Sequence, residues 1–228
     1  MAAQPIIYIV CSDRHRNGKT LLARVLVDYL MLDGHDPFVL DAAFPEGPLR
    51  AYFPGRTALV DFDQMQGRMK LFDTILESPG RDYVIDLPAP QTAPFFQAVT
   101  ELGFAEEART RGFALVVLFI VDRAEDSLKA AADIARNVKP DLLVPVRNAH
   151  VGSALDDTDA KLTIDMPVLD RAAAAIIANR RFSLRSFLLG DEAGMQAHLA
   201  ARLKSFLYEL TTGFREIEPV MSLSRLRA

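Results

Sequence analysis

The sequence predicts an α/β fold in which a mostly parallel central sheet carries helices on both faces. Short apolar runs rich in β-branched residues alternate with helical patterns along most of the 228 residues. The run from Ala114 to Val121 is the most apolar, and we expect it to be a central strand. Uninterrupted apolar runs are typical of parallel strands buried on both faces, and strand–helix alternation is typical of a sheet covered on both sides.

Each expected element follows from a local pattern. In the first helix, apolar residues from Leu22 to Leu30 recur at helical spacing, and Asp33-Gly34 ends it. Proline-rich segments at 44–56 and 87–94 are expected to be loops. The expected strands are 6–10, 38–40, 58–60, 83–85, 114–121, 142–146 and 162–164. The expected helices are 19–32, 65–76, 95–109, 127–138, 172–178 and 195–210.

The length suits a single domain, and neither a repeat nor a linker divides the sequence. We expect one domain over residues 1–215 and a flexible C-terminal tail over 216–228.

Composition narrows the functional classes. Half of the residues are hydrophobic and the net charge is −4, which predicts a globular protein without general affinity for polyanions. The single cysteine, Cys11, excludes an intrachain disulfide and fits a reducing cytoplasm. The four scattered histidines lack cysteine partners at zinc-ligand spacing. No signal peptide is evident at the N-terminus, and no run approaches the roughly 18–20 apolar residues that span a bilayer. These features predict a cytoplasmic protein that does not enter the membrane.

The stretch CSDRHRNGKT, Cys11 to Thr20, joins the first strand to the first helix. Backbone N–H groups and a helix N-terminus at such a junction favour an anion. Gly18 would permit close approach of a phosphate, Lys19 would place a positive charge on it, and Thr20 would offer a hydroxyl to Mg²⁺. A chance Gly-Lys-Thr at a helix start is the alternative, which the strand before and the helix after make less favourable.

Two aspartates end later apolar strands, Asp41 in FVLD and Asp86 in YVID. Ligands of open α/β sheets bind at the carboxyl ends of the strands, so both are expected to converge on the loop after Cys11. Asp86 is the candidate ligand for Mg²⁺, directly or through water. Either aspartate could instead cap a helix or form a turn.

These residues resemble the ParA/MinD family of P-loop ATPases, the deviant Walker A group. The family loop reads K-G-G-x-G-K-T/S, and Arg14 to Thr20 fits that frame with arginine at the signature lysine. Asp86 and Pro88 match the family's D-x-P, and Asn148 matches an asparagine that follows a later strand. Met166-Pro167-Val168 is similar to the late loop near the base. The resemblance covers about three quarters of the chain.

The resemblance implies a three-layer P-loop NTPase fold that binds ATP or ADP with Mg²⁺. It implies catalytic roles for Lys19, Arg14 and Asp41 and metal binding by Thr20 and Asp86. The residues that it places at the nucleotide are Arg16, Asn17, Gly18, Lys19, Thr20, Leu21, Asn148 and Pro167.

The same resemblance implies an ATP-dependent homodimer and an activating partner protein. Arg14 would reach the nucleotide of the second subunit, although a solvated loop arginine is the alternative. The task implied is to position or segregate a cargo such as a plasmid, a chromosome region or a protein complex.

Two departures from the family affect the expected activity. His15 and Arg16 replace a glycine pair, so the loop backbone is expected to differ there. Ala43 replaces the second aspartate of the switch I motif, which helps to position the attacking water. Alanine cannot orient water, so we expect weak hydrolysis and better preserved nucleotide binding.

Three alternatives remain open. Arg180, Arg181 and Arg185 form the densest basic cluster, which would bind nonspecific DNA in the ParA manner or simply be solvated. A metabolic ligase similar to dethiobiotin synthetase or the cobyric-acid enzymes would need a small-substrate pocket. A nucleotide-binding adaptor without hydrolysis would be consistent with Ala43.

Overall fold

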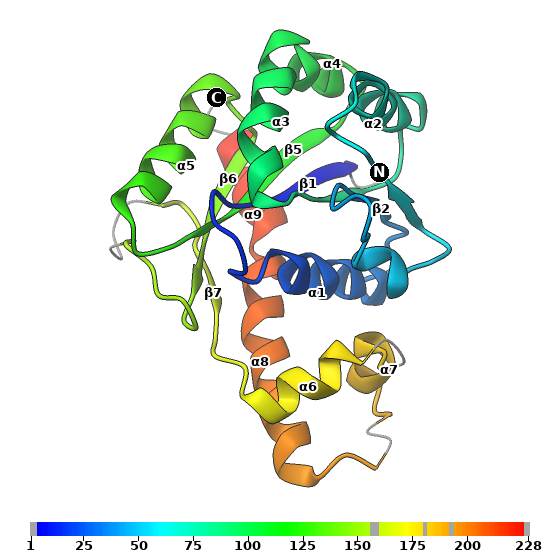
Figure 1. Cartoon of the computed structure of the whole chain (residues 1–228), viewed down its shortest axis with the longest axis vertical. Coiled ribbons are helices and arrows are strands. Elements are labelled where there is room, and N and C mark those ends of the chain that lie inside the picture. Colours follow the sequence, from blue (N-terminus) through cyan, green and yellow to red (C-terminus); the bar gives the residue numbers. More distant parts are fainter. Residues whose placement is uncertain (1–3, 156–159, 180–181, 192–193, 226–228) are drawn as a thin grey trace.

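The computed structural model describes residues 4–155, 160–179, 182–191 and 194–225 (Figure 1). A seven-stranded sheet lies at the centre of the described chain, and every strand pairing is parallel. Its spatial order is β3-β2-β4-β1-β5-β6-β7. The strands are β1 (Ile6–Cys11), β2 (Phe38–Asp41), β3 (Thr57–Leu59), β4 (Tyr83–Asp86), β5 (Ala114–Val121), β6 (Leu142–Asn148) and β7 (Ile164–Met166). The predicted three-layer α/β fold, a parallel sheet with helices on both faces, is confirmed.

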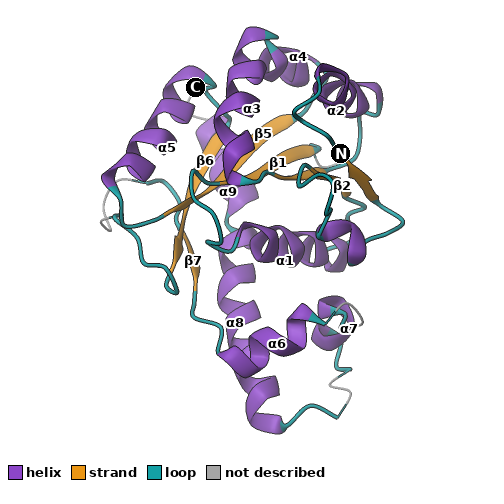
Figure 2. Ribbon diagram, viewed as in Figure 1, coloured by secondary structure: helices purple, strands orange, loops and turns teal. Residues whose placement is uncertain are grey.

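Helices cover both faces of the sheet (Figure 2). One face carries α1, α8 and α9, with α6 and α7 beyond its edge, and the other carries α2 to α5. The described helices are α1 (Lys19–Leu32), η1 (Leu49–Ala51), α2 (Met65–Glu77), α3 (Ala89–Glu101), α4 (Phe104–Thr110), α5 (Glu125–Asn137), α6 (Arg171–Ala178), α7 (Leu184–Leu188), α8 (Ala197–Arg215) and α9 (Ile217–Arg225).

Side-chain alternation along the strands builds the two cores. In β1, Tyr8 and Val10 join the core beneath α1 and α8, whereas Ile7 and Ile9 join the core beneath α2 to α5. Since successive side chains of a strand point to opposite faces, a strand covered on both faces needs apolar residues throughout. All eight residues of β5 are buried, and β5 lies between β1 and β6 as its composition predicts.

The proline-rich segment predicted as a loop begins α3 instead. Pro88 caps this helix, Pro90 lies in its first turn, and Pro94 lies inside it. The first turn of a helix has no partner for its N–H groups, so an early proline loses nothing there. The helix expected over 95–109 is divided into two helices, α3 and α4. The chain breaks between them at Gly103, which has a φ of +62°.

The C-terminal segment differs from the expected flexible tail. Residues 217–225 form α9, and its side chains Ile217 and Met221 are buried in the same core as α1 and α8. These two residues are one helical turn apart, so a single apolar stripe fixes the helix to the core. Residues 226–228 of the predicted tail lie outside the described residues.

Two charged residues of α1, Arg24 and Asp28, make hydrogen bonds to the segments that contain α6 and α7. The buried guanidinium of Arg24 donates hydrogen bonds to the carbonyl oxygens of Ile177 and Phe182, and it lies 3.6 Å from the ring centroid of Tyr52. One turn later Asp28 is also buried and accepts a hydrogen bond from the backbone of Arg185. Burial raises the pKa of Asp28 to about 6, although nearby Arg24 opposes this rise.

Among the described residues, no helix has both the length and the hydropathy that a membrane-spanning segment needs.

Candidate phosphate-binding site

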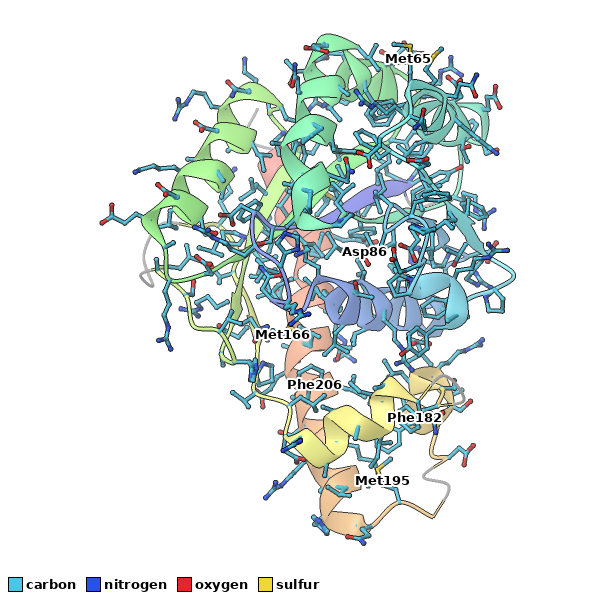
Figure 3. All side chains as sticks on the ribbon, viewed as in Figure 1. Met65, Asp86, Met166, Phe182, Met195 and Phe206 are labelled. Atoms are coloured by element: carbon cyan, nitrogen blue, oxygen red, sulfur yellow. The ribbon has the colours of Figure 1, made fainter. Side chains whose placement is uncertain are left out.

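A loop from Ser12 to Gly18 joins β1 to α1 at the carboxyl edge of the sheet. Gly18 immediately precedes α1 and has a φ of +95°, a conformation that L-residues other than glycine disfavour. A Cβ atom there would lie 2.9 Å from Nδ2 of Asn148 and 3.0 Å from Cε of Met166. Figure 3 shows Met166 beside the start of α1. Glycine is thus required by both the backbone and its neighbours.

We expect Gly18→Ala to lower the free energy of unfolding by about 2 kcal/mol. The left-handed conformation costs about 1–2 kcal/mol for an alanine, and Asn148 would have to move. Gly34→Ala is a matched control, because Gly34 has a φ of +91° and no heavy atom near its Cβ position. In urea unfolding, the free energy of unfolding should fall about 1 kcal/mol further for Gly18→Ala than for Gly34→Ala. About 1 kcal/mol is the contribution of one hydrogen bond, and the added methyl group would disturb one at Asn148. Equal losses would contradict the role of the Asn148 contact.

Lys19 is the first residue of α1, and its side chain lies within the loop. Its Nζ donates to the backbone oxygen of Arg14 at 2.5 Å and to Oδ1 of Asn17 at 3.0 Å. The residue is only 7% exposed, and this burial lowers the pKa of its ammonium, while Asp86 acts in the opposite direction. The loop therefore presents one fixed positive charge among backbone groups, which suits a phosphate.

Thr20 and Asp86 meet across the carboxyl edge of the sheet. The hydroxyl Oγ1 of Thr20 donates to Oδ2 of Asp86 at 2.8 Å. Asp86 ends β4 and is 2% exposed, and Figure 3 shows it over α1. Burial raises the pKa of Asp86 to about 7, and the hydrogen bond from Thr20 opposes that rise. A hydroxyl and a carboxylate are oxygen ligands that fit Mg²⁺, which also keeps water and phosphate ligands. Across the described residues, no group of three or more His, Cys, Asp or Glu side chains forms a metal site by itself.

Asp41 lies next to Asp86, but its carboxylate is hydrogen-bonded to the segment that follows β2. The β2–β4 pairing sets the two residues opposite one another. Oδ1 of Asp41 accepts from the N–H of Ala43 at 3.1 Å, and Oδ2 accepts from the N–H of Leu49 at 2.8 Å. Burial raises the pKa of Asp41, and these backbone bonds oppose the rise. The carboxylate thus shapes the segment after β2, the turn-forming role that was its alternative.

Arg14, at the signature position, pairs with two carboxylates of its own chain. Its Nε lies 3.1 Å from Oδ2 of Asp13 and 3.2 Å from Oδ2 of Asp122. The other oxygen of Asp13 accepts from Oγ of Ser127 at 2.8 Å. The sequence interpretation missed this network, although Asp122 directly follows β5 and so obeys the same strand-end rule as Asp41 and Asp86.

Two asparagines fasten the loop from within. The amide of Asn17 donates to Oγ of Ser12 at 2.5 Å, and this hydroxyl donates to the backbone oxygen of Ile120 at 2.9 Å. Asn148 donates from Nδ2 to the backbone oxygen of Asn17 at 2.8 Å, and its Oδ1 accepts from the N–H of His150 at 2.9 Å. Asn148, which the resemblance places at the nucleotide, therefore lies at the phosphate loop and binds its backbone.

The remaining predicted site residues surround this centre. Arg16 is exposed and has a φ of +54°, so the arginine adopts a conformation typical of the glycine that it replaces. Pro167 directly follows β7, beyond Met166. Leu21 lines a cavity of about 220 Å³. Thr20, Arg24 and residues of α6 also line this cavity, as does Tyr52, which directly follows η1.

The single cysteine and the basic cluster are the two remaining features of the sequence. Cys11 is fully buried at the end of β1, and burial raises the pKa of its thiol far above the ordinary value, which fits a packed residue. Arg185 is exposed in α7, whereas Arg180 and Arg181 lie outside the described residues.

The fold and the loop define a class of protein: an α/β protein with a candidate phosphate site in a strand–loop–helix segment at the carboxyl edge of a parallel sheet. No protein-family model matches the sequence, and no curated protein sequence matches it. Several solved structures are similar to it, among them the following two. One is a nucleotide-binding protein from Archaeoglobus fulgidus in complex with ADP, in which Co was found. It is 16% identical, with a TM-score of 0.44, over 73% of this chain and 84% of that chain.

The other is the MinC:MinD cell division protein complex of Aquifex aeolicus. It is 15% identical, with a TM-score of 0.37, over 63% of this chain and 68% of that chain. At these levels of similarity, the functional interpretation depends on the geometry of the site itself.

Proposed function

We propose that this protein is a nucleotide-switch ATPase of the ParA/MinD type, which binds ATP with Mg²⁺ at the loop from Ser12 to Thr20. The observation that carries the proposal is the 2.8 Å contact between Thr20 and Asp86 beside the buried ammonium of Lys19. A hydroxyl and a carboxylate beside a phosphate loop provide two oxygen ligands for a Mg²⁺ ion. The phosphates of the nucleotide would provide further ligands.

Each residue has a distinct task in this proposal. Lys19 holds the phosphates by charge, Gly18 lets them approach the backbone, and Thr20 and Asp86 hold the metal ion or its water. Bound Mg²⁺ would neutralise the negative charge of the phosphates. The loss of the switch I aspartate at Ala43 and the occupied carboxylate of Asp41 support slow hydrolysis.

Exposed apolar residues support face-to-face dimerisation at the same edge of the sheet. Phe44 follows β2 and Val168 follows β7, and both are more than half exposed. A second subunit would cover these side chains and bring its nucleotide towards the exposed Arg14. An activating partner protein and a cargo would then bind the ATP-dependent homodimer.

The test is the molecular mass in solution with ADP and with a nonhydrolysable ATP analogue. We expect a monomer with ADP and a dimer with the analogue for the unmodified protein, and a monomer with both for Arg14→Ala. Arg136→Ala is the matched control, because Arg136 is exposed on α5 and also lies beside an aspartate. It should dimerise like the unmodified protein. The same mass in every sample would contradict the switch and the role of Arg14.

A second candidate is an ATP-dependent ligase that acts on a small substrate. The cavity of about 220 Å³ beside Thr20 favours it, because a ligase needs room for its substrate next to the nucleotide. Turnover that requires a small carboxylate substrate would select this function. A nonhydrolysing adaptor is the third candidate, and tight nucleotide binding without turnover under any stimulus would select it.

A further inference from the structure

A large cavity lies on the sheet face opposite α1. It has a volume of about 700 Å³ and is lined by Asp13, by α3 from Ala89 to Glu101, and by α5 from Ala130 to Val138. Figure 1 shows α3 and α5 on this side of the sheet. We call this space the α3–α5 groove. Its lining is largely apolar, and the buried side chains Phe96 and Ile134 contribute to it.

The dimensions of the α3–α5 groove suit a helix. It follows α3 from its first to its last residue, and the 13 residues of this helix span about 20 Å. Alanines at 89, 93 and 130 are among its lining residues and permit close approach of another backbone. A helix that inserts one apolar stripe between two others is a common mode of recognition.

The charged residues that line the α3–α5 groove are acidic. They are Asp13, Glu101 and Asp133, and no lysine or arginine is among the lining residues, although Arg14 pairs with Asp13 and Arg136 with Asp133 from beside the groove. Asp13 lies at the end next to the phosphate loop, and Glu101 lies at the far end of α3. An occupant that carries lysine or arginine at its ends would therefore match this surface, and an acidic occupant would be repelled.

The walls of the α3–α5 groove are bonded to the phosphate loop. From α3, the buried hydroxyl of Thr92 donates to the backbone oxygen of Ser12 at 2.9 Å. From α5, Oγ of Ser127 donates to Oδ1 of Asp13 at 2.8 Å. Asp13 in turn lies 3.1 Å from Nε of Arg14. A cation placed beside Asp13 would compete with Arg14 for this carboxylate.

We propose that the α3–α5 groove binds an amphipathic helix of a partner protein, with its apolar stripe in the groove and a basic residue beside Asp13. Pairing of that residue with Asp13 leaves Arg14 attached through Asp122 and lets its guanidinium contact a phosphate bound at the loop of the same subunit, in the monomer. The consequence for Arg14 rests on the proposed nucleotide site, whereas occupation of the groove does not.

The test uses two synthetic helical peptides of about four turns with the same leucine stripe. One carries lysines at its ends and the other carries glutamates. We expect the basic peptide to bind the nucleotide-free protein at least about tenfold more tightly than the acidic one. Ala93→Trp, which fills the groove at an exposed position, should weaken the basic peptide about tenfold. Ala201→Trp, at an exposed position of α8, is the matched control and should not.

Coupling to the loop is measured separately, as the affinity for fluorescent ADP with and without the basic peptide. We expect the peptide to tighten ADP about threefold in the unmodified protein, a coupling of under about 1 kcal/mol. In Arg14→Ala the peptide should still bind but leave ADP affinity unchanged.

Equal affinity for the two peptides, or unaltered binding to Ala93→Trp, would overturn the groove as the binding site. Peptide binding without any change in ADP affinity would overturn the coupling through Arg14. Failure to bind ADP even without peptide would instead overturn the proposed nucleotide site.

Discussion

Replacing Lys19 with alanine is expected to weaken nucleotide binding by about 100-fold while the fold is retained. The ammonium is held inside the loop by the backbone oxygen of Arg14 and by Asn17, so it is already positioned for a phosphate. Removing one partner of a buried, hydrogen-bonded charge pair costs about 2–5 kcal/mol, and 100-fold corresponds to about 2.7 kcal/mol. Titration with fluorescent ADP measures the loss.

Two further variants make this measurement specific. Lys129→Ala removes the same charge from an exposed position of α5 and should bind ADP normally. Thr20→Ala should retain ADP binding without Mg²⁺ but lose the gain that Mg²⁺ gives, because its hydroxyl contacts Asp86 rather than the loop. Unchanged ADP affinity in Lys19→Ala, with a normal unfolding midpoint, would contradict a phosphate site in this loop.

Most of the sheet could be predicted because burial on both faces leaves a plain signal in the sequence. The expected strands overlap all seven described strands, and β5 matches residue for residue. The errors arose where tertiary packing overrides local composition. Pro88 and Pro90 are typical of loops, yet they occupy the start of α3, where proline is tolerated. Likewise, only the core beneath α1 and α8 explains why Ile217 and Met221 form part of a helix.

The positions of the site residues followed from topology, but their hydrogen bonds did not. Parallel strands put Asp41 and Asp86 at one edge, and the β2–β4 register sets them opposite each other. Whether a carboxylate faces a ligand or its own loop depends on the turn that follows it. Asp41 binds the N–H groups of Ala43 and Leu49, whereas Asp86 receives the hydroxyl of Thr20. The pairing of Arg14 with Asp122 likewise needs the neighbouring positions of β1 and β5.

The modified loop shows how larger residues replace two glycines. Arg16 takes the left-handed conformation with a φ of +54°, and its exposed side chain points away from the packed interior. Asn17 and Ser12 then bond to each other beneath the loop, and Asn148 bonds to its backbone from β6. Side-chain hydrogen bonds thus fix a backbone that glycines would leave freer.

The buried carboxyl of Asp28 is expected to make stability fall as pH rises from about 4 to about 7. Its pKa is about 6 in the folded protein, whereas an unfolded aspartate has a pKa of about 3.9. The folded state therefore binds the proton more tightly, and the free energy of unfolding decreases as the proton is lost. The last part of this loss falls between about pH 6 and pH 7, because at pH 6 half of the folded molecules still carry the proton. The two pKa values correspond to about 3 kcal/mol over the whole range.

Asp28→Asn isolates this effect because asparagine has nearly the same shape and no titration. The free energy of unfolding of Asp28→Asn minus that of the unmodified protein should increase by about 2 kcal/mol between pH 4.5 and 7.5, as measured by urea unfolding. Asp133→Asn, at an exposed position of α5, should show no such increase. If the difference for Asp28→Asn instead decreased with pH, the attraction of Arg24 would outweigh the burial of Asp28. The ionised carboxylate, rather than the protonated acid, would then accept the hydrogen bond from the backbone of Arg185 in α7.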